Sequence, residues 1–280
     1  MNIQRIHHYP RVLSIAGSDS GGGAGIQADL KTFSALGCFG MTAITALTAQ
    51  NTCGVRAIHA VPPEMLRDQI DAVLEDIGTD AVKIGMLHSA EIVRTVAQAI
   101  ERHQLCNVVF DPVMVATSGA KLITDEAINV LVSELFPRAA LITPNLDEAA
   151  LLVGQPLTSP HDMAQAAQTL LAKGAHAVLI KGGHLAGALV LDLLLIEGAE
   201  PLWMEAPRIA SANTHGTGCT LSSAIAAHLA LGLSLPEAVQ QARQFVRQAL
   251  QAGASVKTGQ GSGPLNHGFA PMVMQKKLIS

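Results

Sequence analysis

The segment 213–220, Asn-Thr-His-Gly-Thr-Gly-Cys-Thr, combines residue types that could bind and transfer an anionic group. Its two glycines allow a tight turn that directs backbone N–H groups toward a ligand. An apolar run with helical spacing follows at 221–231, and the N-terminus of a helix attracts anions through its unpaired N–H groups and its dipole. Cys219 lies in the first turn, where this field is expected to favour the thiolate. The segment predicts a phosphoryl site; the alternative is an ordinary glycine-rich connection with a small buried cysteine.

A second glycine-rich segment, 17–25, joins a predicted strand to a predicted helix. Its Gly-x-Gly-x-x-Ala spacing is that of dinucleotide-binding loops, but no Asp or Glu lies between Asp29 and Glu64 to bind a ribose. The Gly-Lys-Ser/Thr of a Walker loop is absent, and Asp-Ser-Gly-Gly, known from serine proteases, is best interpreted as a coincidence. The segment therefore predicts close backbone approach to a small ligand, with Asp29 one turn into the helix.

Predicted strands and helices alternate at least five times along the chain. The predicted strands are 12–16, 41–49, 55–61, 81–85, 108–110, 141–142 and 177–180, and a hairpin is predicted for 189–196 and 202–206. The predicted helices are 26–36, 62–77, 89–102, 125–135, 160–172, 221–231 and 235–251. This order predicts an α/β fold: a mostly parallel sheet, helices on both faces, and a small antiparallel hairpin. Because no repeat, linker or change of composition is visible, we expect a single domain over residues 1–280.

Several residues with chemical potential come just after predicted strands: Gly17, Gln50, Met86, Asp111, Asn145 and Lys181. The carboxyl ends of parallel strands form the crevice in which such sheets bind ligands. The convergence predicts one binding site there. Each residue also has a structural interpretation: Asn145 and Glu148 have the spacing of a capping box, Lys181 could be a solvated lysine, and Met86 could belong to the core.

Composition limits the classes of function. The chain has 280 residues, 49% of them hydrophobic, and a net charge of −4 without a basic run, which argues against nucleic acid and anionic membranes as partners. The four cysteines have no paired spacing, which indicates reduced thiols rather than disulfides or a zinc site. With neither a signal peptide nor a membrane-spanning stretch visible, we expect a soluble, cytoplasmic protein.

Taken together and in order, eight segments resemble hydroxymethylpyrimidine/phosphomethylpyrimidine kinase, the thiamin-synthesis family of the ribokinase-like superfamily. They are 16–19, 22–31, 48–52, 83–87, 111–114, 143–149, 181–184 and 214–220. The resemblance implies a ribokinase-like fold, ATP and Mg²⁺ as cofactors, and a homodimer. It also implies two successive phosphoryl transfers to one small pyrimidine, first to the alcohol and then to the phosphomonoester. The chain departs from the family at 18–21, where relatives often carry a proline.

The resemblance also implies roles for individual residues. Gln50 would read the edge of the pyrimidine, in a pocket shaped by Gly17, Asp29, Met86 and Val113. The anion hole and catalytic group would be Gly216, Thr217, Gly218 and Cys219, assisted by Lys181. Asp111 and Glu148 would bind the metal, and Asn145, Lys181 and Thr214 the nucleotide phosphates.

Two alternatives to this activity stay open from the sequence. A pyridoxal or pyridoxine kinase of the same family would share the motifs, and a catalytically silent pyrimidine-binding protein would share the pocket. The role of Cys219 is also open. It stands where sugar-kinase relatives place an aspartate base, so it could accept the hydroxyl proton, with an effect of ~10–10³-fold on kcat, or it could merely fill space.

Overall fold

The computed structural model describes residues 7–114, 123–183, 185 and 187–278, without the side chain of Asp125. The strands are β1 (His7–His8), β2 (Arg11–Asp19), β3 (Phe39–Asn51), β4 (Gly54–Ala60), β5 (Ala81–Ile84), β6 (Val108–Phe110), β7 (Leu141–Ile142), β8 (Ala177–Ile180), β9 (Leu189–Ile196), β10 (Leu202–Pro207) and β11 (Lys277–Leu278). The helices are α1 (Gly25–Ala35), α2 (Pro63–Asp76), α3 (Ala90–Arg102), α4 (Asp125–Leu135), α5 (Leu146–Val153), α6 (Pro160–Ala172), α7 (Thr217–Ala230) and α8 (Leu235–Gly253), with a short 3₁₀ turn at Phe136–Arg138.

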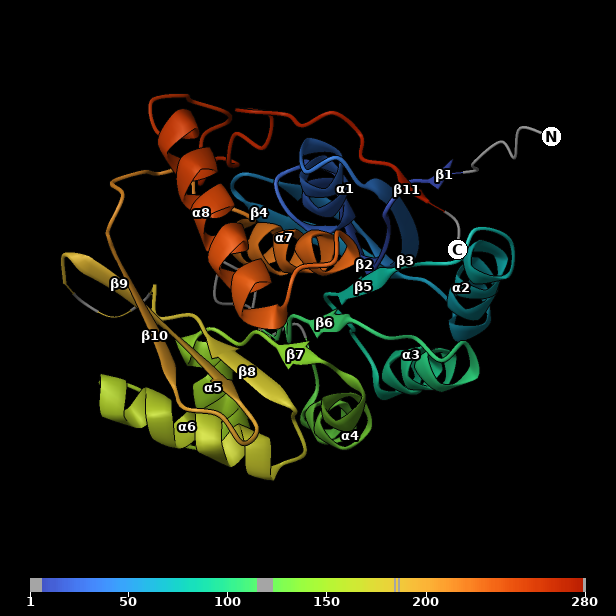
Figure 1. Ribbon diagram of the computed structural model, residues 1–280, viewed down its shortest axis with the longest axis horizontal. Helices are drawn as coiled ribbons and strands as arrows, with labels where there is room; N and C mark the ends of the chain where they lie inside the picture. The colour runs from blue at the N-terminus through green and yellow to red at the C-terminus, as the bar shows by residue number, and fades with distance from the viewer. Residues whose placement is uncertain (1–6, 115–122, 184, 186, 279–280) are drawn as a thin grey trace.

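Nine strands form one sheet in the order β10-β9-β8-β7-β6-β5-β2-β3-β4 (Figure 1). The six strands from β8 to β3 in this order are parallel to one another, while β4 pairs antiparallel with β3 at one edge and β9 and β10 continue antiparallel at the other. The predicted α/β fold with a mostly parallel sheet and an antiparallel hairpin is confirmed.

Helices cover both faces of the sheet. The core on one face includes Phe33 of α1, Ala224 of α7 and Val239 of α8. The core on the other face includes Leu66 of α2, Val96 of α3 and Met163 of α6. The central strands contribute to both cores, since Val12 of β2 faces the first and Leu13 the second. Continuous apolar runs such as 177–180 therefore form strands buried on both faces.

Several elements differ from the prediction. β3 extends to Asn51, so Gln50 lies in the strand rather than after it. The first turn of α7 begins at Thr217, four residues before the predicted start, because the Gly-Thr-Gly segment itself enters the helix. β11 lies in a part of the chain for which no element was predicted, and it pairs antiparallel with β1 near the other end of the chain. Neither two-residue strand has an alternating pattern long enough to be recognised.

One backbone contact fixes the two glycine-rich segments against each other. Gly216 has a φ of +82°, and a Cβ there would lie 1.8 Å from the carbonyl oxygen of Gly23. Only glycine fits both the dihedral angle and the space. The segments 17–25 and 213–220 therefore meet backbone to backbone at the N-terminus of α7.

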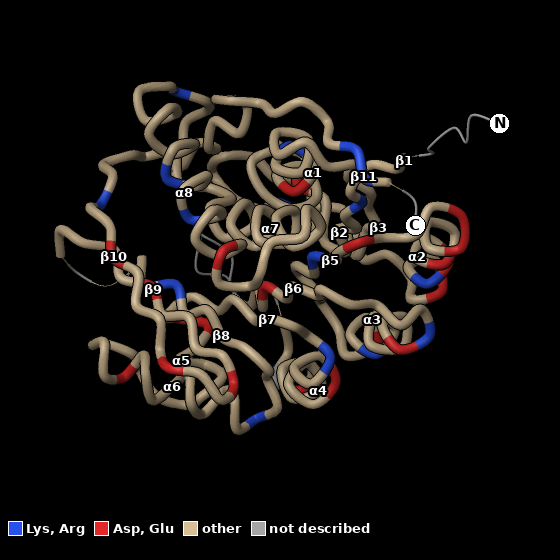
Figure 2. The backbone as a smooth tube through the Cα atoms, viewed as in Figure 1, with Lys and Arg blue, Asp and Glu red and all other residues tan. Residues whose placement is uncertain are grey.

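Acidic and basic residues are interspersed along α2 and α3, and further charges lie at the centre of the molecule beside β5 and β6 (Figure 2). These central charges belong to the site described below. Among the described helices, none combines the length and the apolar character needed to cross a membrane.

Candidate functional site

A cavity of about 600 Å³ opens at the carboxyl ends of the parallel strands. It brings together residues at or just after the carboxyl ends of successive strands: Gly17, Gln50, Met86, Asp111, Asn145 and Lys181. The other predicted site residues that line it are Val113, Glu148, Thr214, Gly216, Thr217, Gly218 and Cys219. Asp29 is the exception, since it is fully buried behind the wall and does not line the cavity.

The N-terminus of α7 forms one wall of the cavity. Thr217 Oγ1 donates to the carbonyl of Thr214 at 2.6 Å, which closes the turn before the helix. Gly216 is the N-cap, and Gly218 and Cys219 belong to the first turn. The N–H groups of a first turn have no intrahelical partner and carry the positive end of the helix dipole. This wall is therefore suited to an anionic group.

The side chain of Cys219 does not have the character predicted for it. Burial raises the pKa of its thiol to about 11, although the charge of Lys83 acts in the opposite direction. The thiol is therefore protonated near neutral pH. The prediction that the helix N-terminus favours the thiolate is wrong, because loss of solvent around the sulfur outweighs the helix dipole and the lysine.

The protonated thiol leads to a prediction for Cys219→Ala. A positioned proton acceptor contributes about 10²–10⁴-fold, and a group with so high a pKa is poorly suited to that role. We expect kcat to fall by less than about 10-fold, with an unchanged pH profile between about pH 6 and 9. Steady-state kinetics of Cys219→Ala and of the remote, buried Cys38→Ala test this. A loss above about 10²-fold in Cys219→Ala alone would show that the sulfur does take the proton.

Asp111, Lys181 and Glu148 form a charged cluster at the ends of β6, β7 and β8. Lys181 Nζ lies 2.8 Å from Asp111 Oδ1 and 3.9 Å from Glu148 Oε2. Asp111 also accepts hydrogen bonds from Thr143 Oγ1 at 3.1 Å and from Ser222 Oγ at 3.3 Å. Burial opposes ionisation of Asp111, but the charges of Lys181 and Lys83 lower its pKa. Asp111 is therefore a buried carboxylate held ionised by lysines.

The pKa of Glu148 moves the other way. Burial raises it to about 7, even though the charge of Lys181 opposes the shift. Glu148 Oε2 accepts from the backbone N–H of Asn145 at 2.8 Å, and Asn145 Oδ1 accepts from the backbone N–H of Glu148 at 2.9 Å. The capping-box interpretation of this pair is thus confirmed, and both side chains line the cavity as well.

The side chains at the cavity suit a hard divalent cation that is held mainly by water and substrate phosphates. The described residues contain no group of three or more His, Cys, Asp or Glu side chains placed to hold a metal ion. Asp111 and Glu148 bring two carboxylates to the cavity. Mg²⁺ is commonly bound by one or two carboxylates together with water and substrate phosphates, so these two residues fit it.

Next to the cavity, Asp29 and Lys83 form a fully buried ion pair. Lys83 Nζ lies 3.0 and 2.9 Å from the two carboxylate oxygens of Asp29. Ser14 Oγ and Ser223 Oγ each donate to Asp29 at 2.6 Å. Burial lowers the pKa of Lys83, but the charge of Asp29 outweighs this and raises it. Lys83 lines the cavity, so Asp29 acts on the site through this lysine.

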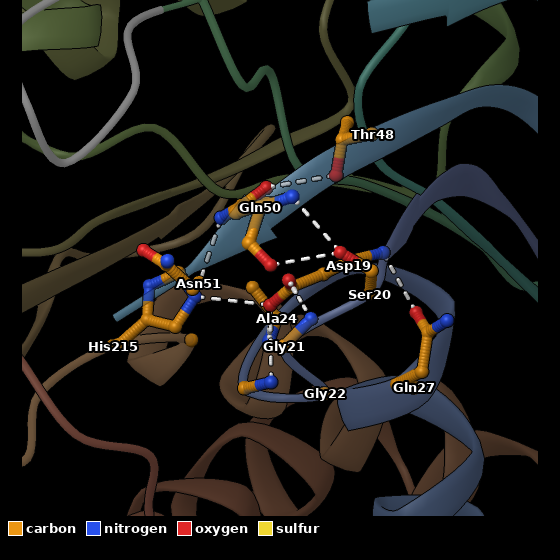
Figure 3. A network of polar contacts seen from close by, with 12 residues as sticks. Asp19, Ser20, Gly21, Gly22, Ala24, Gln27, Thr48, Gln50, Asn51 and His215 are labelled. Atoms are coloured by element: carbon orange, nitrogen blue, oxygen red, sulfur yellow. Dashed lines mark hydrogen bonds and ion pairs between the residues drawn. The ribbon is translucent and has the colours of Figure 1, made fainter. Parts of the chain in front are cut away.

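Asp19 of β2, Gln50 of β3 and His215 also line the cavity and face one another (Figure 3). His215 Nε2 lies 3.0 Å from Asp19 Oδ2 and 3.4 Å from Gln50 Nε2. Ser20 Oγ accepts from the backbone N–H of Gln50 at 2.9 Å and donates to its carbonyl at 2.8 Å. Asp19 and His215 stood in the segments singled out from the sequence, but no role was predicted for them.

Two arginines near the β9–β10 hairpin were not predicted at all. Arg208 donates from its guanidinium to the carbonyls of Gly183, Leu185 and Gly187 at 2.7, 2.6 and 3.0 Å. Arg243 Nε donates to Asp192 Oδ2 at 2.7 Å, and Asp192 Oδ1 accepts from the N–H of Gly182 at 2.8 Å. Both arginines line the cavity. His184, part of a segment that carried the resemblance, lies outside the described residues.

Nothing in the local sequence marks these arginines. Arg243 lies on α8, whose spacing is that of an ordinary amphipathic helix, and it reaches the cavity only because α8 packs beside α7 and the hairpin. Arg208 follows β10 without any motif. A sequence pattern cannot reveal a site residue whose position depends on packing between distant elements.

The comparisons with known proteins support the phosphate-binding character of this cavity. The family model described as phosphomethylpyrimidine kinase matches residues 19–266. A hydroxymethylpyrimidine/phosphomethylpyrimidine kinase of Rhizobium meliloti is 51% identical over 256 residues, which cover 91% of this chain and 96% of the relative. The enzyme of the same name from Escherichia coli is 46% identical, also over 91% of this chain and 96% of the relative.

Solved structures of kinases are also similar to this chain. The phosphomethylpyrimidine kinase of Clostridium difficile superposes with a TM-score of 0.75 at 43% identity, covering 85% of this chain and 98% of that one. The pyridoxal kinase of Staphylococcus aureus in complex with AMP-PCP and pyridoxal superposes with a TM-score of 0.84 at 37% identity, covering 93% and 94%.

Proposed function

The chain belongs to the phosphomethylpyrimidine kinase family, and we propose that it uses ATP to phosphorylate 4-amino-5-hydroxymethyl-2-methylpyrimidine and then its monophosphate. The observation that carries this function is the cavity at the carboxyl ends of the parallel strands. It joins Gln50, suited to a pyrimidine edge, to Lys181 and the α7 N-terminus, suited to phosphate. The first step forms a bond between the alcohol oxygen and the γ-phosphorus, breaks the bond from that phosphorus to the bridging oxygen of ATP, and releases ADP and the alcohol proton. The second joins a phosphate oxygen of the monophosphate to the γ-phosphorus of another ATP, breaks the corresponding bond and again releases ADP.

We propose that the residues act chiefly by position and charge. Phosphoryl transfer requires little covalent assistance, so aligned reactants and neutralised charge supply most of the rate. Lys181 would face the transferred phosphate, and the N–H groups of Gly218 and Cys219 would donate hydrogen bonds to the oxygens of that phosphate. The ionised Asp111 holds the Lys181 ammonium at 2.8 Å and so keeps it oriented.

We propose that Asp111 and Glu148 hold Mg²⁺ together with the nucleotide phosphates, with Asn145 and Thr214 beside them. The ion, when bound, supplies further neutralisation of phosphate charge. Because the pKa of Glu148 is about 7, a bound cation would favour loss of its proton.

We also propose a homodimer, the state that the resemblance implies. β4 is an edge strand of the sheet, and Leu47 and Ile58 on the β3–β4 pair are exposed. Exposed apolar edge strands are prone to pair with another chain. Light scattering after size-exclusion chromatography would give the mass in solution, and a monomer at micromolar concentration would contradict the proposal.

The direct test of the function is product analysis. With ATP and Mg²⁺ we expect the hydroxymethylpyrimidine to be converted first to the monophosphate and then to the diphosphate, resolved by ion-exchange chromatography. Accumulation of monophosphate alone after exhaustive incubation would contradict the two-step reaction. Absence of any phosphorylated pyrimidine, with turnover of pyridoxal, would favour the second candidate, a pyridoxal kinase, which the likeness to the Staphylococcus aureus enzyme supports.

Gln50→Leu separates these two substrates further. A carboxamide can accept from the 4-amino group and donate to the adjacent ring nitrogen, and pyridoxal lacks this edge. Loss of a buried partner costs ~1–3 kcal/mol, so kcat/KM for the pyrimidine should fall roughly 5- to 150-fold, with a smaller loss for any pyridoxal turnover. Equal losses for both substrates would mean that Gln50 only stabilises the end of β3.

A further inference from the structure

The groups around the Gln50 side chain determine its orientation, and Asp19 is the first of these groups. The two carboxylate oxygens of Asp19 accept from the backbone N–H groups of Gly21, Gly23 and Ala24 at 2.8, 3.0 and 2.8 Å. Burial opposes ionisation, but the hydrogen bonds from His215, Ala24 and Gly21 lower the pKa of Asp19. An ionised carboxylate only accepts hydrogen bonds. The His215 Nε2 atom, 3.0 Å from Asp19 Oδ2, must therefore carry a hydrogen and donate it.

This hydrogen determines what His215 can offer to Gln50. A ring nitrogen that donates to Asp19 has no lone pair left to accept a hydrogen bond. The Gln50 atom 3.4 Å from it therefore cannot be a donor without placing two hydrogens face to face. The terminal oxygen and nitrogen of a glutamine are distinguished by their hydrogen-bond partners. The favoured amide orientation therefore places Oε1, not Nε2, on the His215 side.

The hydrogen bonds of Thr48, on the other side of the amide, indicate the same orientation of Gln50. Its Oγ1 lies 2.9 Å from the carbonyl oxygen of Ser18 and 3.1 Å from the second terminal atom of the Gln50 amide. A hydroxyl has one hydrogen, and the Ser18 carbonyl can only accept it. Thr48 then offers a lone pair to Gln50, which requires the amide NH₂ on that side. One orientation of the amide is compatible with both neighbours, whereas the opposite one places hydrogen against hydrogen at His215 and lone pair against lone pair at Thr48.

We propose that His215, positioned by Asp19, fixes the order in which Gln50 presents an acceptor and a donor to the cavity, and thereby selects a 4-aminopyrimidine over a 4-oxopyrimidine. This inference rests on the proposed function. The acceptor lies on the His215 side and the donor on the Thr48 side. The 4-amino group and its neighbouring ring nitrogen match this order, since the amino group donates and the nitrogen accepts. A 4-oxo ring with a protonated ring nitrogen, bound in the same orientation, presents the reverse order and opposes both groups.

His215 is a positioning residue in this arrangement, because it acts on the substrate through Gln50. Its imidazole is also held sterically, since a Cβ at Gly23 would lie 2.4 Å from His215 Cδ2. The backbone of Gln50 is fixed by the two hydrogen bonds with Ser20. Rotation of the amide is thus the remaining freedom, and the Nε2–H of His215 removes it.

The test compares 4-amino- and 4-oxo-5-hydroxymethyl-2-methylpyrimidine as ligands of the full chain. Equilibrium dissociation constants from calorimetry and kcat/KM values are measured for the wild type, His215→Leu, Thr48→Val and Thr48→Ser. We expect a wild-type preference for the amino compound of about 10²-fold or more, as found for sites built to hydrogen-bond a polar group. His215→Leu should reduce the preference about 10-fold, because one of the two constraints on the amide is lost and the lone pair of Thr48 alone then orients it.

Thr48→Val and Thr48→Ser test the proposal independently if His215→Leu fails to fold. Thr48→Val should weaken the preference several-fold, and Thr48→Ser, which keeps the hydroxyl, should restore it. The exposed His161→Leu on α6 controls for loss of an imidazole. Equal losses for both ligands in His215→Leu or Thr48→Val, with the preference unchanged, would overturn the proposal. Selective binding without turnover would contradict the proposed kinase activity alone, and binding of neither pyrimidine would overturn both.

Discussion

Lys181→Met is expected to lower kcat by about 10²–10³-fold, the loss typical when one preorganised charge is removed from a transition state. The ammonium lies between Asp111 and Glu148 on the cavity wall, so its removal takes away the positive charge offered to the transferred phosphate. It also leaves two carboxylates to repel that phosphate. The affinity for the pyrimidine should change little, because Gln50 and Met86 do not depend on this lysine.

Three measurements decide the role of Lys181. Single-turnover kinetics give the rate of phosphoryl transfer, calorimetry gives the pyrimidine affinity, and thermal unfolding shows whether the variant is folded. Lys181→Arg keeps the charge and should recover part of the rate, although its planar geometry differs. Lys173→Met, an exposed lysine at the end of α6, is the matched control and should behave as the wild type. A kcat for Lys181→Met within about threefold of the wild type would exclude an electrostatic role.

Lys83→Met is expected to destabilise the protein by about 3–5 kcal/mol, the largest effect on folding in this set of variants. The substitution leaves the Asp29 carboxylate without a cation in a site where both side chains are fully buried. Ser14 and Ser223 still donate to Asp29, but two neutral hydroxyls do not replace a charge. Urea unfolding at constant pH gives the change in free energy directly.

The double variant Asp29→Asn/Lys83→Met identifies the cause. When both charges are removed, the penalty of an unpaired buried ion disappears, so the double variant should be more stable than Lys83→Met alone. Arg102→Met breaks the ion pair with Asp71 at the surface, and such pairs contribute about 0–1 kcal/mol. Similar losses for Lys83→Met and Arg102→Met would show that burial of the Asp29–Lys83 pair has no special consequence.

Much of the fold was predictable because its signals are local. Apolar runs such as 177–180, alternating with helical stripes, identify buried parallel strands without reference to any neighbour. The position of the site followed from the same signals, since residues after parallel strands meet at one edge of the sheet. Gln50, Asp111 and Lys181 lie far apart in the chain and line one cavity for this reason.

The properties of individual groups were less predictable because they depend on surroundings that no local pattern records. The helix N-terminus near Cys219 could be recognised, whereas the burial that raises its pKa to about 11 could not. Asp29 of α1 could be placed near the site but not behind Lys83, a residue of β5. The spacing of Asn145 and Glu148 was compatible with a cap or a ligand, and the structure shows the cap while leaving both at the cavity.

The contact between Gly216 and Gly23 has a consequence for an enzyme with two acceptors. The two loops meet so closely that a single methyl group would not fit between them, so they cannot move closer together. In the second transfer, however, the attacking oxygen lies one phosphoryl group further from the ring than in the first. Closer approach of the loops therefore cannot compensate for the shorter reach of the first acceptor, and the position of the substrate must differ between the two transfers. We expect the pyrimidine ring to occupy two depths in the same pocket, one for each phosphorylation.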